Sequence, residues 1–274
     1  MSISPPQPAN GREKRDIVFD DVGLAFDENL VLDGISFSLR PGETKILLGV
    51  AGTGKSTVLK LCLGLLKPDR GRIMVLGEDV TQMKEEDLFE LRRRVGMVFQ
   101  ESALFDSLTV RENVAYRLIE EHVDPQEAET RVREALRFVE LERTLDMFPS
   151  ELSGGMRRRV AIARAIVTQP ELLLYDSPTG GLDPVTSTTI VELIVKQRDV
   201  YHTSSLMVTH RLQDAFTMAT NYFDPKTNQM LPLGPNKVNL DTTFLILRDG
   251  NVIFDGNAPE LAASRDEYIR EYIA

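Results

Sequence analysis

The sequence lacks several features that mark particular classes of protein. A single cysteine, Cys62, among 274 residues excludes an internal disulfide and any zinc site built from several cysteines. Such sparse cysteine usage is typical of cytoplasmic proteins. No apolar run approaches the roughly 18–20 residues needed to span a bilayer, so any membrane role must come through a partner. The formal net charge of −10 argues against a general affinity for nucleic acid.

Three local stretches of unusual composition predict no site. The basic runs Arg92-Arg93-Arg94 and Arg157-Arg158-Arg159 are each interpreted as a solvated helix face. The first residues, MSISPPQPANGR, are polar and rich in proline and have no apolar core. They predict a disordered leader over residues 1–14 and not a signal peptide.

Strands alternate with helices along most of the chain, which predicts an α/β fold with a parallel sheet between helical layers. Ahead of them, alternation of apolar and polar residues predicts two strands over 16–26 and 31–39. The other expected elements are a strand, glycine-rich turn and helix over 43–66, a strand pair over 71–80, helices at 84–94, 126–147, 154–168 and 184–197, and strands at 171–175, 204–208 and 244–250.

Two segments near the end of the chain depart from this alternation. Residues 221–240 are rich in Asn, Pro and Gly and have no period, which predicts a loop or an irregular hairpin inserted into the main domain. That domain is expected to span residues 15–260. A C-terminal helix is expected over 259–274, because Pro259 is well placed in a first helical turn.

The segment GVAGTGKS, Gly49 to Ser56, matches the phosphate-loop pattern at every fixed position. The glycines let backbone N–H groups curl around a phosphate, and the helix that begins at Lys55 points its positive end at the anion. Lys55 is expected to reach the β- and γ-phosphates of a nucleotide, and the Ser56 hydroxyl to bind Mg²⁺. The pattern follows an apolar strand and opens an apolar helix, which makes a chance glycine-rich turn a poor explanation. The residues expected to bind the nucleotide here are Gly49, Gly52, Thr53, Gly54, Lys55, Ser56 and Thr57.

A second part of a phosphate site is predicted at LLLYD, residues 172–176. A buried strand that ends in Asp176 can deliver a carboxylate to a Mg²⁺ ion. The pattern is weak alone and gains its value from pairing with the phosphate loop. The next residue, Ser177, occupies the position where a hydrolase of this type carries a glutamate.

The segment ELSGGMRRRVAIARAI, residues 151–166, narrows the assignment. Leu152-Ser153-Gly154-Gly155 resembles the signature of ATP-binding cassette (ABC) proteins, and it begins 24 residues before Asp176. The resemblance covers about residues 16–260. It implies a P-loop (RecA-like) core with an N-terminal antiparallel β subdomain and an inserted α-helical subdomain at about 101–165.

The resemblance also implies roles for single residues. Gln100 matches the glutamine that links Mg²⁺ and the attacking water to the permease contact, and Gly181-Leu182-Asp183 matches the D-loop. His210 matches the switch histidine, and Phe26 an aromatic that stacks on adenine. Each has an ordinary alternative when taken alone: a surface glutamine, a strand-end histidine, a core phenylalanine.

The mechanism that the family implies needs two copies of the chain. Ser153, Gly154 and Gly155 begin a helix, which is itself an anion site, and they cap the γ-phosphate bound by a second copy. Two ATP molecules, each with Mg²⁺ held by Ser56, Gln100 and Asp176, are then enclosed in a head-to-tail dimer. Opening and closing of that dimer drives a partner.

Met156 and the segment after Gln100, ESALFDSLTVRENVAYRL, resemble the ATPase of Mce/Mla-type systems that transport phospholipids or other lipids. This implies a permease present in two copies, an MCE-domain lipid-binding protein, and a peripheral location at the cytoplasmic face of the bacterial inner membrane. The segment is partly shared with importers of amino acids and organic solutes, which remain an alternative.

Other classes of ABC protein fit less well. Only 52 residues separate Gln100 from Ser153, too few for the coiled coil of a DNA-repair or chromosome-structure ATPase, and one cassette is fewer than a translation factor carries. A nucleotide-gated scaffold that does not hydrolyse ATP remains possible because of Ser177. The transported substrate, its direction and the origin of Ser177 do not follow from the sequence.

Overall fold

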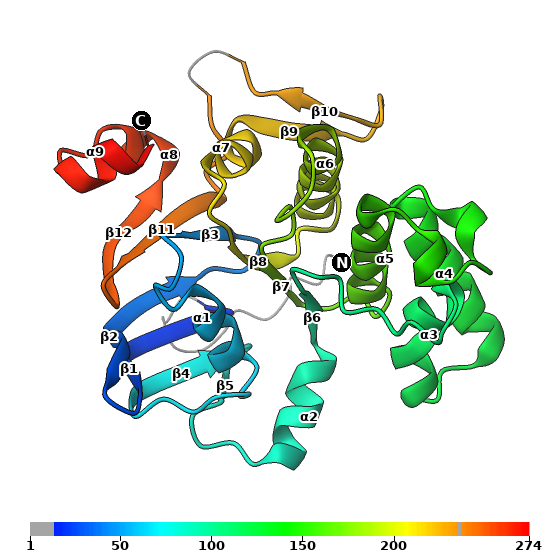
Figure 1. Ribbon diagram of the computed structural model, residues 1–274, viewed down its shortest axis with the longest axis horizontal. Coiled ribbons are helices and arrows are strands. Elements are labelled where there is room, and N and C mark those ends of the chain that lie inside the picture. Colours follow the sequence, from blue (N-terminus) through cyan, green and yellow to red (C-terminus); the bar gives the residue numbers. More distant parts are fainter. Residues whose placement is uncertain (1–13, 235–236, 274) are drawn as a thin grey trace, which may run out of the picture.

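A computed structural model describes residues 14–234 and 237–273 (Figure 1). The predicted leader, residues 1–14, lies outside the described residues except for Lys14. The strands of the described part are β1 (Ile17–Phe26), β2 (Asn29–Leu39), β3 (Thr44–Leu48), β4 (Arg70–Val75), β5 (Glu78–Asp79), β6 (Val95–Val98), β7 (Leu172–Asp176), β8 (Ser204–Val208), β9 (Asn221–Asp224), β10 (Gln229–Pro232), β11 (Thr242–Arg248) and β12 (Asn251–Asn257). The helices are α1 (Lys55–Cys62), α2 (Glu85–Arg93), α3 (Val110–Glu120), α4 (Pro125–Phe138), α5 (Gly154–Ile166), α6 (Pro184–Tyr201), α7 (Leu212–Thr220), α8 (Ala258–Ala262) and α9 (Glu267–Ile273).

The larger strands form two sheets. One is antiparallel with the order β2-β1-β4-β5, and the other has the order β12-β11-β3-β8-β7-β6 and is parallel from β11 to β6. Figure 1 shows α3, α4 and α5 grouped beside the β6 edge of the second sheet, away from the antiparallel sheet. The predicted α/β fold, with an antiparallel β part and a helical insert, is confirmed.

The hydrophobic core lies on both faces of the six-stranded sheet, because successive side chains of a strand point to opposite faces. In β3, Ile46 and Leu48 belong to the cluster shared with α3–α7, whereas Leu47 belongs to the cluster shared with α1 and the antiparallel sheet. Burial on both faces explains why β3, β7 and β8 read as nearly continuous apolar runs and show little alternation.

The parallel register determines which chain segments meet. Ile46 of β3 pairs with Met207 of β8, and Asp176 of β7 pairs with Val208 of β8. The loops that follow β3, β6, β7 and β8 therefore emerge at one edge of the sheet, the usual place for a ligand in such folds.

Two helices of the inserted part, α3 and α4, differ from the sequence prediction. The helix expected over 126–147 ends at Phe138, where Glu140 takes a left-handed conformation (φ 61°) and the Leu141 N–H donates to Leu136 O at 2.8 Å. This C-terminal cap turns the chain so that Leu141 returns to the core. Helix α3 was not predicted, although its capping box of Thr109 and Glu112 is a sequence signal for a helix start.

Residues 221–240 contain a regular β-hairpin, in which β9 and β10 pair antiparallel. One face of α6 holds it: Glu192 accepts from the Met230 N–H, Asp199 accepts from the Phe223 N–H, and Lys196 lies 5.1 Å from the centre of the Phe223 ring. These contacts pack the insertion against the core.

A helix begins here with Pro259 in its first turn, as expected, but the single helix over 259–274 is wrong, because the chain forms α8 and α9. Asp266 begins the second helix, since its carboxylate accepts from the Ile269 N–H at 3.0 Å. Helix α9 folds back so that the Tyr272 hydroxyl accepts from the Gly49 N–H at 3.1 Å.

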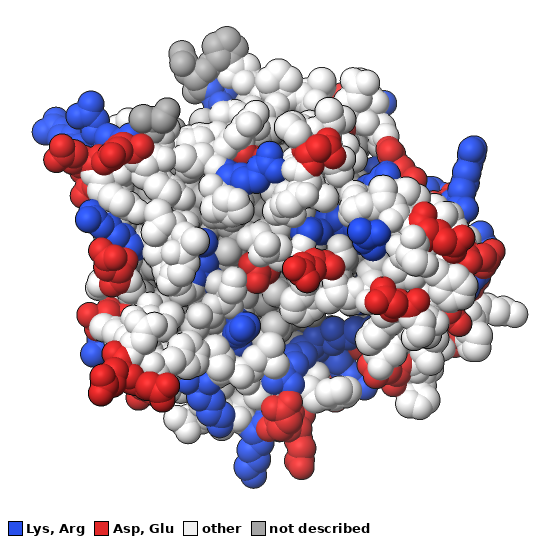
Figure 2. Space-filling model, viewed as in Figure 1, with Lys and Arg blue, Asp and Glu red and all other residues white. Residues whose placement is uncertain are grey.

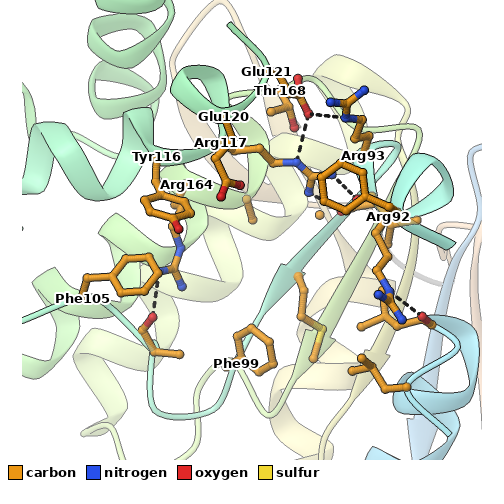
Figure 3. A pocket seen from close by; sticks show the side chains of 18 residues that line it. Arg92, Arg93, Phe99, Phe105, Tyr116, Arg117, Glu120, Glu121, Arg164 and Thr168 are labelled. Atoms are coloured by element: carbon orange, nitrogen blue, oxygen red, sulfur yellow. Dashed lines mark hydrogen bonds and ion pairs between the residues drawn. The ribbon is translucent and has the colours of Figure 1, made fainter. Parts of the chain in front are cut away.

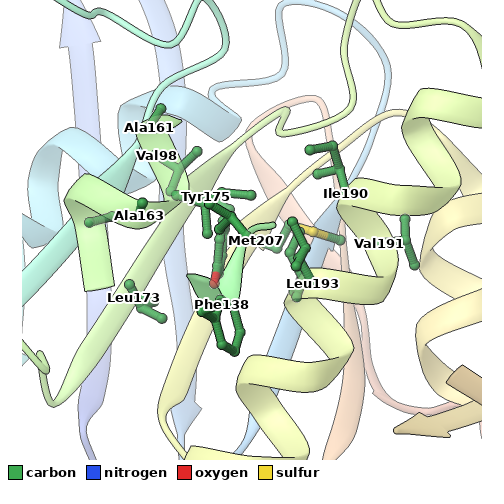
Figure 4. Packing of buried hydrophobic residues seen from close by; sticks show 14 of the residues in the cluster. Val98, Phe138, Ala161, Ala163, Leu173, Tyr175, Ile190, Val191, Leu193 and Met207 are labelled. Carbon is green, nitrogen blue, oxygen red and sulfur yellow. The ribbon is translucent and has the colours of Figure 1, made fainter. Parts of the chain in front are cut away.

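Tyr175 of β7 is 1% exposed and packs among apolar residues, with its hydroxyl pointing towards Phe138 in Figure 4. That hydroxyl has no hydrogen-bond partner among the described residues. Burial without a partner leaves the desolvation of the hydroxyl uncompensated.

We therefore expect Tyr175→Phe to raise the free energy of unfolding by about 1 kcal/mol, because it removes an unpaired polar group and keeps the ring. Urea denaturation measures the change. Tyr201→Phe, at a position that is 56% exposed, is the matched control and should stay within about 0.5 kcal/mol. A loss of stability in Tyr175→Phe would show that the hydroxyl has a partner, such as a buried water.

Candidate functional site

The loop between β3 and α1 needs glycine for two steric reasons. Gly54 takes a left-handed conformation (φ 84°) just before α1, and a side chain there would meet Val31 Cγ1 at 2.9 Å. A side chain on Gly49 would meet the carbonyl oxygen of Leu247 at 2.6 Å. The loop therefore presents its backbone at the start of α1, where N–H groups are unpaired and the helix dipole is positive.

The Lys55 ammonium lies folded back over this loop. It donates to Gly49 O at 2.8 Å and to Val50 O at 2.6 Å. Desolvation by burial lowers the pKa of Lys55, against the attraction of Asp176. Carbonyl oxygens satisfy the cation without neutralising its charge, so it remains available to a phosphate.

Two oxygen groups from distant parts of the chain meet beside the lysine. The Ser56 hydroxyl donates to an Asp176 carboxylate oxygen at 3.1 Å. Among the described residues no cluster of three or more His, Cys, Asp or Glu side chains could hold a metal ion. A hydroxyl and a carboxylate are the oxygen donors that Mg²⁺ accepts when phosphates and waters supply the remaining ligands. The pair therefore fits Mg²⁺ bound together with a nucleotide.

A cavity of about 520 Å³ lies over the loop. Phe26, 47% exposed, stands at its side, and four motifs separated along the chain contribute to its wall. The lining residues are Phe26, Val31, Ala51, Gly52, Gly54, Lys55, Ser56, Thr57, Gln100, Ser177, Val208 and His210. Of these, Val31, Ala51 and Val208 are not among the residues that the sequence predicted for the site. Thr53 lies behind the wall, where its hydroxyl donates to Val50 O at 2.9 Å.

Ser177 sits at the end of β7 with a left-handed backbone (φ 46°), which is unusual for a residue other than glycine. Its N–H donates to Val208 O at 2.8 Å, and its carbonyl accepts from the Gly180 N–H at 2.9 Å. Neighbouring loops thus hold the strained backbone in place. Gln100 and His210 are exposed and line the same cavity.

The signature residues do not line the cavity of their own chain. Ser153 caps α5, since its hydroxyl accepts from the Met156 N–H at 3.2 Å, and Asp183 caps α6 by accepting from the Val185 and Thr186 N–H groups. The two helix starts lie against each other: a side chain on Gly155 would meet Thr186 Cγ2 at 2.3 Å. Ser153, Gly154, Gly155 and Asp183 therefore form a second cluster, separate from the phosphate loop.

A groove of about 500 Å³ adjoins Gln100, and Figure 3 shows the side chains that line it. Its walls come from α2, β6, α3 and α5. It combines the partly exposed rings Phe89, Phe99, Phe105 and Tyr116 with the basic side chains Arg92, Arg93, Arg117 and Arg164. Figure 2 shows basic side chains gathered in this hollow between α2 and α3, although the whole chain is acidic.

Comparison with known proteins identifies the family. The family model described as ABC transporter matches residues 32–180, from β2 through the phosphate loop and the signature to Gly180. The chain belongs to the ABC transporter family. Its phosphate loop, signature and β7 aspartate are thus parts of an ABC ATPase domain, a family whose members bind ATP. Among the described residues, no helix is both long and apolar enough to cross a membrane.

Curated relatives carry different names. A probable ribonucleotide transport ATP-binding protein of Mycobacterium leprae is 35% identical over 87% of this chain and 70% of its own length. Protein TRIGALACTOSYLDIACYLGLYCEROL 3, chloroplastic, of Arabidopsis thaliana is 42% identical over 92% of this chain and 71% of its own length. A methionine import ATP-binding protein of Bacillus cereus is 40% identical over 66% of this chain and 53% of its own length.

Solved ABC structures share the fold. A dimeric ATP-binding cassette bound to ADP and Pi superposes with a TM-score of 0.72 at 28% identity, covering 88% of this chain and 98% of that chain. The protein cbiO1 of Clostridium perfringens, part of the transporter complex cbiONQ, superposes with a TM-score of 0.77 at 27% identity over 94% of each chain.

One prediction about basic residues is wrong. Arg158, expected on a solvated helix face, is 4% exposed. It points into the molecule and donates to the carbonyls of Ser177 (3.0 Å) and Pro178 (2.8 Å) and to that of Gln100. Its place three, four and seven residues before Ala161, Ile162 and Ala165, all buried in α5, is the signal that could have found it.

We expect Lys55→Ala to weaken ATP binding at least about tenfold, or about 1.4 kcal/mol, because the phosphates lose their cation. Titration with a fluorescent ATP analogue measures the affinity. Lys60→Ala, an exposed lysine of the same helix, is the matched control. Equal affinities of the two variants would contradict a nucleotide site at this loop.

Proposed function

We propose that this chain is the ATP-hydrolysing subunit of a transporter that moves lipid, with phospholipid as the expected cargo. The convergence of Phe26 and four motif segments on one cavity supports ATP as the ligand. The 42% identity over 92% of this chain to a protein named for trigalactosyldiacylglycerol, a glycolipid, favours lipid as the cargo. An amino-acid importer is the second candidate, supported by the methionine import relative, which matches a smaller share of the chain.

Each residue that lines the cavity has a role in this proposal. Phe26 would stack on the adenine ring, and the loop N–H groups from Gly49 to Thr57 would surround the phosphates. Lys55 would leave its two carbonyl partners for the β- and γ-phosphates. Ser56, Asp176 and Gln100 would hold Mg²⁺, which when bound neutralises phosphate charge.

Closure of the site would need a second copy of the chain. Ser153, Gly154 and Gly155 lie apart from their own phosphate loop, at a helix start suited to an anion. In a head-to-tail dimer they would cap the γ-phosphate on the partner copy, with Asp183 at the interface. The similarity to a dimeric cassette bound to ADP and Pi supports this arrangement.

Ser177 would limit the rate of hydrolysis. A hydroxyl has no useful basicity near neutral pH, so it can orient the attacking water but not accept its proton. Lys55, Mg²⁺ and the opposing signature would still supply positioning and electrostatic stabilisation. His210 and Gln100 line the same cavity and could hold the water. Slow turnover and a long-lived ATP-bound dimer follow, because both sites of a homodimer carry the serine.

We expect Ser177→Glu to accelerate ATP hydrolysis by about 10²-fold or more, because it supplies the missing base. Phosphate release under saturating Mg-ATP measures the rate, with Ser177→Gln as the control of similar size and no basicity. If the glutamate variant is no faster than the native chain, position 177 does not limit hydrolysis. If neither variant nor native chain turns over while ATP still binds, the chain is a nucleotide-gated scaffold.

The groove beside Gln100 is proposed to receive a cytoplasmic helix of the permease. Its exposed rings offer apolar contact. Arg92, Arg93 and Arg117, which pair with Glu85, Glu90 and Glu121 in the structure, would exchange these partners for acidic or carbonyl groups of the helix. Phe99 lines the groove, and Gln100, its neighbour in the chain, lines the nucleotide cavity. A helix bound in the groove would therefore influence the nucleotide cavity through these two adjacent residues. The proposed location is the cytoplasmic face of the bacterial inner membrane, with a permease in two copies and an MCE-domain protein as further partners.

We expect a photo-reactive amino acid at Phe89 to cross-link to an integral membrane protein in intact cells, because this exposed ring lines the groove. The same group at Tyr222, on the β9 hairpin, is the control and should not label that protein. Mass spectrometry identifies the product. Labelling of soluble proteins alone would contradict the permease proposal.

A further inference from the structure

Arg158 of α5 joins two loops from distant parts of the chain. Its guanidinium donates to the carbonyls of Ser177 (3.0 Å), Pro178 (2.8 Å) and Gly180 (3.4 Å), and to that of Gln100. Its Nε also donates to the Ser102 hydroxyl at 3.3 Å. One buried side chain therefore connects the segment that follows β6 with the segment that follows β7.

Arg211, next to His210, holds the same segment from the other side. Its Nη1 donates to Thr179 O (3.3 Å), Leu182 O (3.4 Å) and the Ser187 hydroxyl (2.7 Å). Its Nε lies 3.4 Å from the carboxylate of Asp214, which also accepts from the Thr179 hydroxyl at 2.5 Å. Between them, the two arginines bond the carbonyls of residues 177, 178, 179, 180 and 182.

The geometry of this segment needs such support. Ser177 has a left-handed backbone, which persists only where its surroundings fix it. Burial of Arg158 is costly, and desolvation lowers the pKa of its guanidinium, yet five planar donors can satisfy several carbonyls at once. Lysine cannot form the same set of hydrogen bonds, because its ammonium is a compact point charge.

We propose that Arg158 and Arg211 are positioning residues for ATP hydrolysis, which hold residues 177–182 at a fixed place between Gln100 and His210. The inference rests on the proposed ATPase function and deepens it. A serine at position 177 has a short reach, so its distance from the attacking water depends on where the backbone is held. The same bonds set the position of Leu182 and Asp183, at the proposed dimer interface.

Arg158→Lys tests the inference, with Arg159→Lys as the matched control. Arg159 is its neighbour on α5 and donates to a single carbonyl, Val139 O at 3.2 Å, within the helical part of the chain. We expect Arg158→Lys to lower kcat between about 10- and 100-fold, since small displacements of reacting groups cost that much. ATP affinity should stay within about twofold, because Arg158 makes no bond to the 49–57 loop in the structure.

A double-mutant cycle separates positioning from loss of folded protein. If Arg158 positions residue 177, the acceleration gained by Ser177→Glu should shrink by about fivefold or more in the Arg158→Lys background. A general loss of structure would lower the serine and glutamate forms in equal proportion. Arg211→Lys, at a less buried position, should show the same pattern and remains testable if Arg158→Lys does not fold.

The remaining outcomes are also decisive. An unchanged kcat in both lysine variants overturns the inference, as does a parallel fall in kcat, ATP affinity and thermal stability. If Ser177→Glu brings no gain in the native background, the account of the serine fails, and the fall in kcat of the lysine variants alone decides the inference. If no form hydrolyses ATP, sedimentation with Mg-ATP decides it: the inference requires weaker dimerisation in both lysine variants than in Arg159→Lys.

Discussion

The parallel pairing of β3, β8, β7 and β6 is the constraint on which the rest of the site depends. Because all four strands run the same way, the loops after them open at one edge of the sheet. The phosphate loop, Gln100, Ser177 and His210 meet there although they are spread over 160 residues of chain, from 51 to 210. A one-residue slip of β7 would turn Asp176 away from Ser56, since side chains alternate between faces.

Backbone carbonyls, more than carboxylates, are the partners of the cations around this edge. Lys55, Arg158 and Arg211 each bond two or more carbonyl oxygens. Carbonyl dipoles fix the position of a cation but leave its charge uncancelled. An acidic chain with a net charge of −10 can therefore keep positive charge beside the cavity where a phosphate is proposed to bind.

The sequence predicted the elements whose ends carry strong local signals. Glycines and Lys55 marked the start of α1, and apolar runs marked β3, β7 and β8. Two of the errors fall at helix boundaries that neither glycine nor proline marks: α4 ends before Glu140, and Asp266 caps a new helix. Tertiary packing decides such boundaries, because Leu141 and Ile269 are drawn into the core.

The sequence alone determined the family and the residues of each motif, because phosphate binding demands glycine, lysine and hydroxyl groups at fixed spacing. Only the tertiary structure decided how the motifs are held. Residues 157, 158 and 159 are all arginine. Successive helix positions are rotated by about 100°, however, and only the middle side chain is buried against Ser177 and Gln100. The helical repeat of α5 favours burial of Arg158, but which loop carbonyls it bonds depends on what packs against that face.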